Sequence, residues 1–516
     1  MADENVIYEN QIVNGPNPSE GDMYLGVVSD AVTDATMIDV DAAGMTQAEH
    51  TMLDKCVRTL ADRRDNNVKR WTYYLGKDVM KNLGLAFPDG NKIAGKIKPV
   101  CGWGAKAVDL LVTRSQLDYF TFDGKDDDEA LRRAYDDNDL ELSYSQLLVD
   151  QCVSGVEFMS VTAGNDEWDV TPIVIATHTS LDATCVWDRR RRRVAYGMVV
   201  TDADDDGRPT SLNLITDDAI YTYFRDPFNG RWQRLVTEST VGLPSFVPFP
   251  FRPSNIRPLG QSRITPSMMS LIDCAVRETM RSEVASEVYT IPQRYLLGID
   301  PKKLQKGQKA YWMNYFAVGA DNNGNVPQAG QFAPPGINDH IQYMRALASQ
   351  FAGEAGIPLA SIGVQAENPS SAEAIHAERE DLIIEAERLN AVNGRALRQV
   401  AMLVMAIANG CKVSELDEAD RTVKAKFRPV DQPSVSAMSD AILKQVQAIP
   451  ELGMSDVVLE KLGYDDDDIR RINSNKSKAV AMQMMQQLAT TRQTLTAPAQ
   501  TMTSQYGERH WHHDDE

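Results

Sequence analysis

The densest cluster of side chains that could do chemistry is the acidic run Asp202-Ala203-Asp204-Asp205-Asp206-Gly207. Its spacing matches the first half of a calcium-binding loop, in which side-chain oxygens at alternate positions surround the ion and a glycine makes the turn. The twelfth position is Asn213, where such a loop carries a bidentate Glu. The flanking residues have the pattern of strands. We therefore interpret the run as a solvated hairpin turn, with an opportunistic cation site as the alternative.

A second candidate, Gly102-Trp103-Gly104-Ala105-Lys106-Ala107, fits the loose glycine pattern of nucleotide-binding turns. That chemistry needs a buried strand before the glycines and a helix whose N-terminus meets phosphate. The preceding Lys96-Ile97-Lys98-Pro99-Val100 makes a poor buried strand. The segment is better interpreted as a simple helix start, and we expect no bound cofactor.

Five consecutive arginines, Arg189–Arg193, could bind phosphate or the acidic arm of a partner. The run lies between two predicted strands, so a solvated turn is the plainer interpretation.

Other catalytic signatures are missing from the sequence. None of the seven histidines forms H-E-x-x-H, and neither G-x-x-x-x-G-K-[ST] nor G-x-S-x-G occurs. The tail motif His510-Trp511-His512-His513 could bind a metal weakly, but a disordered tail is the simpler interpretation. No residue or motif indicates a particular class of reaction. We therefore expect a protein that is not an enzyme, with no catalytic or metal-binding residue.

The elements around these residues belong to a chain of 516 residues, which is roughly three domains' worth of length. Its 43% apolar and 24% charged residues suit a globular protein with a sizeable core. No apolar run reaches the roughly 18 residues of a membrane span. The six cysteines are widely spread and the first ten residues lack a secretory pattern, so we expect reduced cysteines in a cytoplasmic protein.

The net charge of −20 is unevenly distributed. Residues 1–50 hold ten Asp and Glu and no Lys or Arg, whereas residues 51–430 hold 50 acids and 45 bases. Residues 431–516 hold 13 acids and 8 bases. The body is therefore nearly balanced, and the sequence-wide basic footprint of a protein that grips nucleic acid is absent.

Periodicity predicts a mainly helical α+β fold. A helical pattern that starts near Met45, and others near residues 105–115, 127–135 and 144–154, precede short apolar runs from Val156 to Thr237. These runs predict an antiparallel meander of six or seven strands. Two long amphipathic helices follow, one from the N-cap Thr265 and Pro266 to a point before Pro292, and one over 336–356. A small module over 291–335 separates them. Two such antiparallel rods need neighbours to cover their sides, which predicts an oligomer.

Residues 357–369 interrupt the helical pattern, and a third long helix follows. Ser370 and Glu373 have the spacing of a capping box at its start, with Ser370 as the cap and Glu373 reaching back. Gly394 in its middle predicts a kink or packing point.

Four segments carry a resemblance to a known family, the portal proteins of long-tailed (siphophage-type) bacteriophages. They are Arg63-Arg64 through Trp71–Gly76, the proline crossing Pro248-Phe249 through Leu259-Gly260-Gln261-Ser262-Arg263-Ile264, the helix Thr265–Val288 with Pro292 after it, and Gly356-Ile357-Pro358 through Asn368–Ile375. The resemblance spans about residues 50–410. The order and spacing of these motifs are more specific than any one of them.

The resemblance implies a portal fold with wing, stem, clip and crown, assembled as a ring. On this chain the parts would be an acidic N-terminal arm (1–45), a wing of helices and an antiparallel meander (46–262), stem helix 1 (263–290), a clip (291–335), stem helix 2 (336–356), a tunnel loop (357–369), a long kinked helix returning to the wing (370–430), a helical crown (431–504) and a disordered tail (505–516).

The resemblance also implies a function and partners. A ring of copies of the chain, usually twelve, would sit at one capsid vertex of the virion and form the channel for DNA packaging and ejection. The large terminase subunit and a head–tail adaptor would dock on it, the major capsid and scaffold proteins would contact it, and double-stranded DNA would pass through it non-specifically. No membrane is implied.

The tunnel loop would offer the channel-facing side chains Leu359, Ile362, Val364, Gln365, Glu367 and Asn368. It contains one charged residue, Glu367, and no Lys or Arg. A weakly charged wall would let phosphate pass without holding it, because a strongly basic wall binds DNA through counterion release.

Two other functions stay open. A dispersed-site, metal-dependent phage hydrolase would need the Asp clusters to converge on one pocket. Another capsid or adaptor protein would have no need for a stalk of two long helices.

Overall fold

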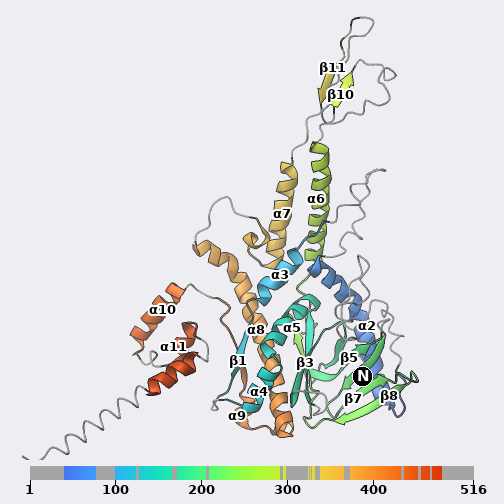
Figure 1. Ribbon diagram of the computed structural model, residues 1–516, viewed down its shortest axis with the longest axis vertical. Helices are drawn as coiled ribbons and strands as arrows, with labels where there is room; N and C mark the ends of the chain where they lie inside the picture. The colour runs from blue at the N-terminus through green and yellow to red at the C-terminus, as the bar shows by residue number, and fades with distance from the viewer. Residues whose placement is uncertain are drawn as a thin grey trace, which may run out of the picture. The chain divides into compact units, whose positions relative to one another are not determined.

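The computed structural model describes residues 40–76, 99–123, 127–164, 171–204, 208–290, 294–297, 324, 326, 328–331, 337–364, 372–431, 435–450, 452, 455–464 and 468–478. The chain divides into two compact units, Met1–Val430 and Asp431–Glu516. The fold class is α+β, as predicted, with helices and antiparallel sheets in the first unit (Figure 1).

Four helices precede the main sheets: α2 (Gln47–Leu75), α3 (Trp103–Val112), α4 (Glu129–Asp137) and α5 (Leu140–Ser154). Side-chain caps start two of them. Thr46 accepts a hydrogen bond from the backbone N–H of Glu49, and Asp128 accepts one from Leu131. α3 starts directly after Gly102, so the glycine pattern there begins a helix, as the sequence indicated.

Two antiparallel sheets follow. Strands β2 (Val156–Ala163), β3 (Ile173–His178) and β9 (Phe246–Pro250) form one sheet in the order β3-β2-β9. The other is a meander of β4 (Ala183–Asp188), β5 (Arg193–Ala203), β6 (Pro209–Ile215), β7 (Ala219–Arg225) and β8 (Trp232–Glu238).

The predicted meander is therefore antiparallel throughout but split between two sheets. The split occurs at the turn after β3, where the N–H groups of Asp182 and Ala183 both bond to Thr179 O. The first six residues of β2 are all buried, on both faces of the strand. The helices α5 and α8 pack against β2, and the strands β3 and β9 flank it in the sheet. A period-2 pattern that identifies strands does not say which sheet each one joins.

Two antiparallel helices, α6 (Pro266–Thr290) and α7 (Asn338–Ala355), pack against each other (Figure 1). Side-chain contacts set the direction, because Thr265 Oγ1 bonds to Glu354 Oε1 and His340 Nδ1 to Glu278 Oε1. Thr265 caps α6 as predicted, accepting a hydrogen bond from Met268 N at 3.2 Å. In the segment that joins the two helices, β10 (Arg294–Leu297) pairs antiparallel with β11 (Gln328–Gln331). We call α6 and α7 the helical hairpin.

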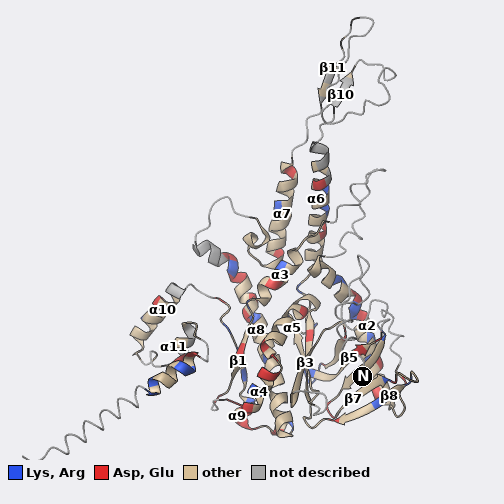
Figure 2. Ribbon diagram, viewed as in Figure 1, with Lys and Arg blue, Asp and Glu red and all other residues tan. Residues whose placement is uncertain are grey.

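A longer helix, α8 (Ala372–Asn409), follows the 3-10 turn η4 (Leu359–Ile362). After α8 come η5 (Val413–Glu415), α9 (Glu418–Arg421) and β12 (Lys424–Phe427), which pairs with β1 (Leu117–Thr121). One hydrophobic cluster joins α3, α5, β2, the lower hairpin and α8, and Leu397, Val400 and Val404 at its centre are fully buried. Acidic and basic residues are interspersed along α2 and α8 (Figure 2).

The second unit contains α10 (Val435–Ala448), α11 (Asp456–Lys461) and a helix over 468–478. Ile442 and Ile469 are its most buried apolar side chains among those described. Asn473 Nδ2 donates to Asp456 Oδ1 at 2.8 Å and ties the last helix to α11.

Candidate functional site

The first part of the candidate site is the turn that leads into the helical hairpin. Gly260 has a φ of +77°, and a Cβ there would lie 2.4 Å from Phe251 O and 2.5 Å from Gly155 O. Only glycine fits this approach of two backbones. Ser262 Oγ donates to Val153 O at 2.6 Å and accepts from Ile264 N at 2.9 Å. The Gly-x-Ser-x-Ile pattern therefore fixes the chain between β9 and α6.

Arg263, between that serine and isoleucine, joins several helices below the hairpin. Its side chain is 1% exposed, its Nε donates to Ala107 O at 2.6 Å, and its terminal nitrogen donates to Ala355 O at 2.8 Å. The other terminal nitrogen pairs with Glu385 on α8, which also pairs with the half-exposed Arg252. One buried guanidinium thus links α3, the C-terminus of α7 and α8.

The described part of the predicted tunnel loop starts at this junction. Gly356 ends α7 with a φ of +62°, and the N–H of Ile357 returns to Ala352 O at 3.0 Å. Pro358 follows, and the η4 turn carries the chain to Gly363 with a φ of +85°. The loop therefore begins as a short, hydrogen-bonded turn anchored to the end of α7.

The predicted channel residues fall into two groups. Leu359 and Ile362 are partly buried and pack against the main core, and Val364 lines a cavity of about 450 Å³ beside α6 and α7. Gln365, Glu367 and Asn368 lie outside the described residues, as does the predicted cap Ser370. Glu373 lies in the first turn of α8, but its side chain is not described. The channel-facing role of the loop stays a prediction.

Gly394 lies in α8, which is helical from Ala372 to Asn409. A Cβ at this position would lie 3.4 Å from the ring of Phe427 on β12. The predicted kink stays a prediction.

The residue before Gly394 was missed by sequence reasoning. Asn393 is fully buried and exchanges two amide hydrogen bonds with Gln151 of α5, at 2.8 and 2.9 Å. Its Nδ2 also donates to Tyr144 OH at 3.0 Å, and that hydroxyl contacts Ser115. The sequence does show a polar residue at an apolar-stripe position of α8, which could have drawn attention to Asn393. Its partner Gln151, however, lies 242 residues away in the chain.

A pair of buried carboxyls lies near the N-terminus of β2. Burial raises the pKa of Asp150 to about 7, with a further contribution from the charge of Asp182. Burial likewise raises the pKa of Glu157 well above its usual value, and the nearby charge of Asp150 adds to this. Oε2 of Glu157 has no hydrogen-bond partner among the described residues. Both carboxyls therefore hold their protons to higher pH in the folded protein than exposed carboxyls do.

Among the described residues, the side chains considered for metal chemistry do not converge. Asp202 and Asp204 lie at the β5–β6 turn, where Asp204 accepts from Arg208 N at 2.8 Å, and residues 205–207 fall outside the described part. Within the described ranges, no three His, Cys, Asp or Glu side chains are grouped so that they could hold a metal ion. Nor does any helix in those ranges have the length and apolar character to cross a membrane.

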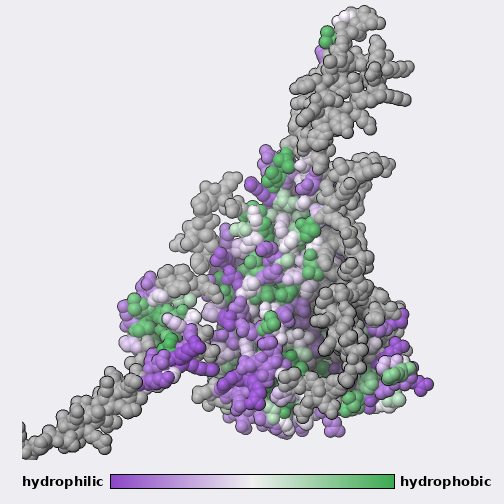
Figure 3. Space-filling model, viewed as in Figure 1, coloured by the Kyte–Doolittle hydropathy of each residue, from purple (hydrophilic) through white to green (hydrophobic). Residues whose placement is uncertain are grey.

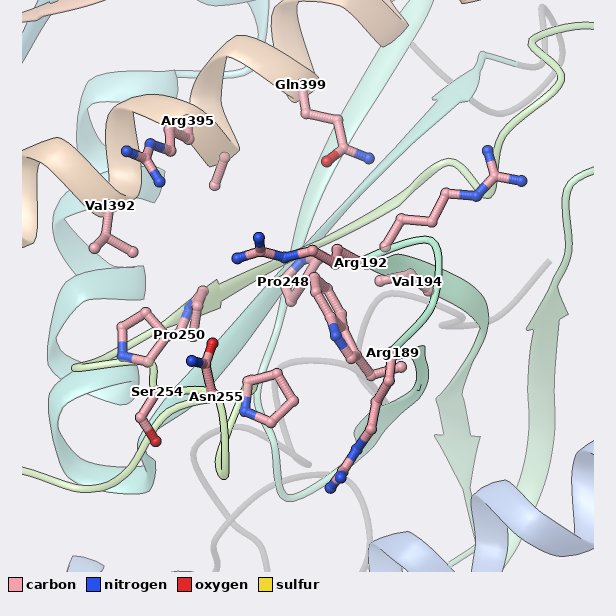
Figure 4. A pocket seen from close by; sticks show the side chains of 15 residues that line it. Arg189, Arg192, Val194, Pro248, Pro250, Ser254, Asn255, Val392, Arg395 and Gln399 are labelled. Atoms are coloured by element: carbon pink, nitrogen blue, oxygen red, sulfur yellow. The ribbon is translucent and has the colours of Figure 1, made fainter.

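The five arginines form the β4–β5 turn. Asp188 Oδ1 accepts hydrogen bonds from the backbone N–H groups of Arg190 and Arg191, and Arg192 has a φ of +54°. The turn interpretation is therefore confirmed. The side chains of this turn also line a cavity with residues of α8, a relationship that the sequence did not predict (Figure 4).

Comparison with known protein families decides what this architecture is. The family described as "Phage portal protein, SPP1 Gp6-like" matches residues 53–480. The chain belongs to this phage portal protein family. The match covers the helical hairpin, the turn at Gly260 and the whole of α8. The family is structural, not catalytic, which argues against the hydrolase alternative.

Two curated relatives agree with the family. The chain is 25% identical to the portal protein of Mycobacterium phage D29 over 404 residues, covering 76% of this chain and 81% of the relative. It is 25% identical to the portal protein of Mycobacterium phage L5 over 416 residues, covering 78% and 83%.

Solved structures show more distant likenesses. A chain from the virion of a native gene transfer agent particle is 14% identical, with 77% of this chain and 93% of that chain covered and a TM-score of 0.39. A chain from the neck of the native particle, computed with C12 symmetry, is also 14% identical, with 78% and 98% covered and a TM-score of 0.38.

Proposed function

We propose that copies of this portal-family chain assemble into a ring, of twelve subunits, at one vertex of a phage capsid. The ring forms the channel through which DNA is packaged and ejected. The observation that carries the proposal is the helical hairpin, because the sides that α3 and η4 leave uncovered carry exposed apolar side chains among the described residues. A single copy would leave these sides in water.

The apolar side chains of α7 support a neighbour at this surface. Ile341 and Tyr343 of this helix are 45% and 46% exposed, and Ile337, directly before it, is 43% exposed. Figure 3 shows apolar surface gathered over the hairpin, whereas the region near α4 and α9 is mainly hydrophilic. Exposed apolar surface of this kind marks interfaces. Packing against an identical copy would bury it, and a closed ring leaves no copy uncovered.

The parts of the chain take the corresponding roles. Residues 46–262 form the wing, 263–290 and 336–356 the stem, 291–335 the clip, 370–430 the helix returning to the wing, and 431–504 the crown. Residues 357–369 form the tunnel loop at the channel. The acidic arm (1–45) and the tail (505–516) are assigned to none of these parts.

The partners follow from those roles. The large terminase subunit and later the head–tail adaptor dock on the clip, and the major capsid and scaffold proteins contact the outer ring. DNA passes through non-specifically, because a nearly balanced body holds phosphate weakly. The protein is assembled in the host cytoplasm and resides in the virion.

Electron microscopy of the purified protein tests the ring. We expect end-on views with a central hole. Ile341→Asp places a charge in the proposed interface and should shift the protein to monomers, whereas Thr237→Asp, on the exposed strand β8, should leave rings intact. A wild-type protein that stays monomeric at every concentration, or one that hydrolyses phosphoesters with added metal, would contradict the proposal.

DNA packaging in vitro tests the tunnel loop. Lysines in place of Gln365 and Asn368 should slow or jam packaging, because they would hold phosphate at the narrowest point. Thr237→Lys on the exposed strand β8 adds a charge outside the loop and should leave the rate unchanged. Equal packaging rates for all variants would show that residues 357–369 do not line the channel.

A further inference from the structure

Cationic side chains gather around a cavity of about 670 Å³ between α8 and the β4–β5 turn. Arg189, Arg192 and Arg193 come from the turn and Arg395 from α8. Figure 4 shows Arg395 and Gln399 on the helix side of the cavity and Arg192 on the side of the turn. Apart from Arg193, which is half-buried, these guanidinium groups are exposed and available to a ligand.

Two further cavities adjoin the first. One, of about 480 Å³, shares Trp187, Arg189 and Pro258 with it and adds four cations, Lys55, Arg63, Arg70 and Arg257. The other, of about 460 Å³, shares Arg193 and Arg395 and adds Arg398. We call the three together the arginine groove.

The charge of the groove is one-sided. Nine Lys and Arg line the three cavities, and among the described residues that line them none is Asp or Glu. This occurs in a chain with a net charge of −20. No described carboxylate lies within ion-pair distance of Arg189, Arg192 or Arg395. Burial lowers the pKa of Arg70, and the neighbouring charge of Arg257 lowers it further, which shows that the cations repel one another. Such a surface is stabilised when an anionic ligand covers it.

The floor of the groove is apolar. Trp187, Pro248, Pro250 and Pro258 line it between the cations. A DNA backbone offers regularly spaced phosphates but no side chains that could occupy an apolar floor. A polypeptide that mixes carboxylates with apolar side chains matches both features.

The chain itself contains such a polypeptide. Residues 1–39 hold eight Asp and Glu and no Lys or Arg, and Met23-Tyr24-Leu25-Gly26-Val27-Val28 lies between Asp22 and Asp30. The segment joins the described chain at Val40, seven residues before α2 begins.

The attachment point is close enough for the chain to reach the groove. Lys55, Thr59, Arg63 and Arg70 line it from one face of α2. At 1.5 Å per residue, these positions lie about 12–35 Å along the helix from its start. A segment of 39 residues can span far more than this, up to about 130 Å when extended. Tethering also raises the effective concentration of the acidic segment at its own groove into the millimolar range.

We propose that the arginine groove binds the acidic N-terminal segment, residues 1–39, of the same chain. The carboxylates pair with the arginines of the β4–β5 turn, α2 and α8, and the apolar residues of the segment contact the tryptophan and prolines. The groove is an intramolecular docking site for an acidic peptide.

Photo-crosslinking in the full-length protein tests this. A benzoylphenylalanine at Asn255, an exposed residue that lines the first cavity, should crosslink to residues 1–39, as identified by mass spectrometry. The same probe placed at Thr237 on β8 is the control, and it should not crosslink to residues 1–39. The product should run as a single chain on a denaturing gel, and its yield should fall in high salt because exposed charges are screened.

A charge swap excludes misfolding as the cause of any loss. Arg192→Glu with Arg395→Glu should reduce the crosslink yield by roughly tenfold, since attraction becomes repulsion at two sites. Adding Glu20→Lys, Asp22→Lys and Asp30→Lys to that double variant should restore the crosslink yield. Restoration cannot result from a damaged fold.

Four results would overturn the proposal. Crosslinks that join two chains would assign the groove to a neighbour's segment. Crosslinks to residues outside 1–39, or a yield unaffected by the swap, would exclude this segment as the ligand. DNA binding that is lost in the double Glu variant, with crosslinks to residues 1–39 absent throughout, would make the groove a nucleic-acid site.

Discussion

Arg263 and Glu385 form an ion pair in which the arginine is almost completely buried and the carboxylate is 13% exposed. The pair joins the entry of α6 to the first half of α8, and the same guanidinium donates to backbone oxygens of α3 and α7. The junction below the helical hairpin therefore depends on one side chain.

Glu385→Gln should lower the thermal unfolding midpoint strongly, corresponding to about 3–5 kcal/mol, because it leaves a buried arginine without its counter-charge. Arg252→Ala is the matched control. It removes the other cation on the same carboxylate, but that cation is 48% exposed, so the cost should stay below about 1 kcal/mol. Equal effects of the two variants would show that burial of the pair is not what matters.

Asn393→Ala should destabilise the packing of α8 on α5 by about 1–3 kcal/mol, because the buried amide of Gln151 loses both partners. Glu387→Ala, at an exposed position of the same helix, should change stability by less than about 0.5 kcal/mol. Chemical denaturation followed by far-UV circular dichroism compares the two. An unchanged midpoint for Asn393→Ala would mean that water replaces the missing amide.

Gly260→Ala should cost at least about 2 kcal/mol, since φ is +77° and the added methyl group would meet Phe251 O at 2.4 Å. Gly353→Ala tests the opposite case. That glycine lies within α7 with nothing within 4 Å of a Cβ, so alanine should stabilise by about 0.5–1 kcal/mol. Thermal melts of the two variants should therefore move in opposite directions, and a shift of the same sign would contradict the close backbone approach at Gly260.

Stability should fall between about pH 4 and pH 7 because of Asp150 and Glu157. Their pKa values are raised in the folded state, to about 7 for Asp150, so the folded chain keeps protons that the unfolded chain releases in this window. Each such group makes unfolding easier as pH rises, until its folded pKa is passed.

Substitution of these carboxyls should flatten that pH dependence. Asp150→Asn and Glu157→Gln should each raise the thermal midpoint relative to the unmodified protein at pH 8, and the gain should shrink towards pH 4. Asp137→Asn, exposed on α4, controls for the change in net charge and should leave the slope unchanged. A gain that is constant across pH would mean that the effect is one of packing.

The sequence alone determined the elements that depend on local chemistry. Thr265 followed by Pro266 predicted the start of α6, because a cap and a fixed φ act within one turn of helix. The position of Arg189–Arg193 between two predicted strands likewise predicted a turn, which the structure confirms. The order of the Gly260–Ile264 segment, the hairpin and the loop after Gly356 was enough to indicate the portal family, which the match over residues 53–480 confirmed.

Only the tertiary structure decided which distant residues meet. Arg263 reaches Glu385 across 122 residues, and Gln151 reaches Asn393 across 242, and no periodicity encodes such partners. The division of the strands between two sheets was likewise decided by what covers each face. The Arg189–Arg193 turn became one wall of a basic groove because the fold places Arg395 opposite it. Charge in a sequence is local, whereas the field that a ligand meets is summed over side chains that folding brings together.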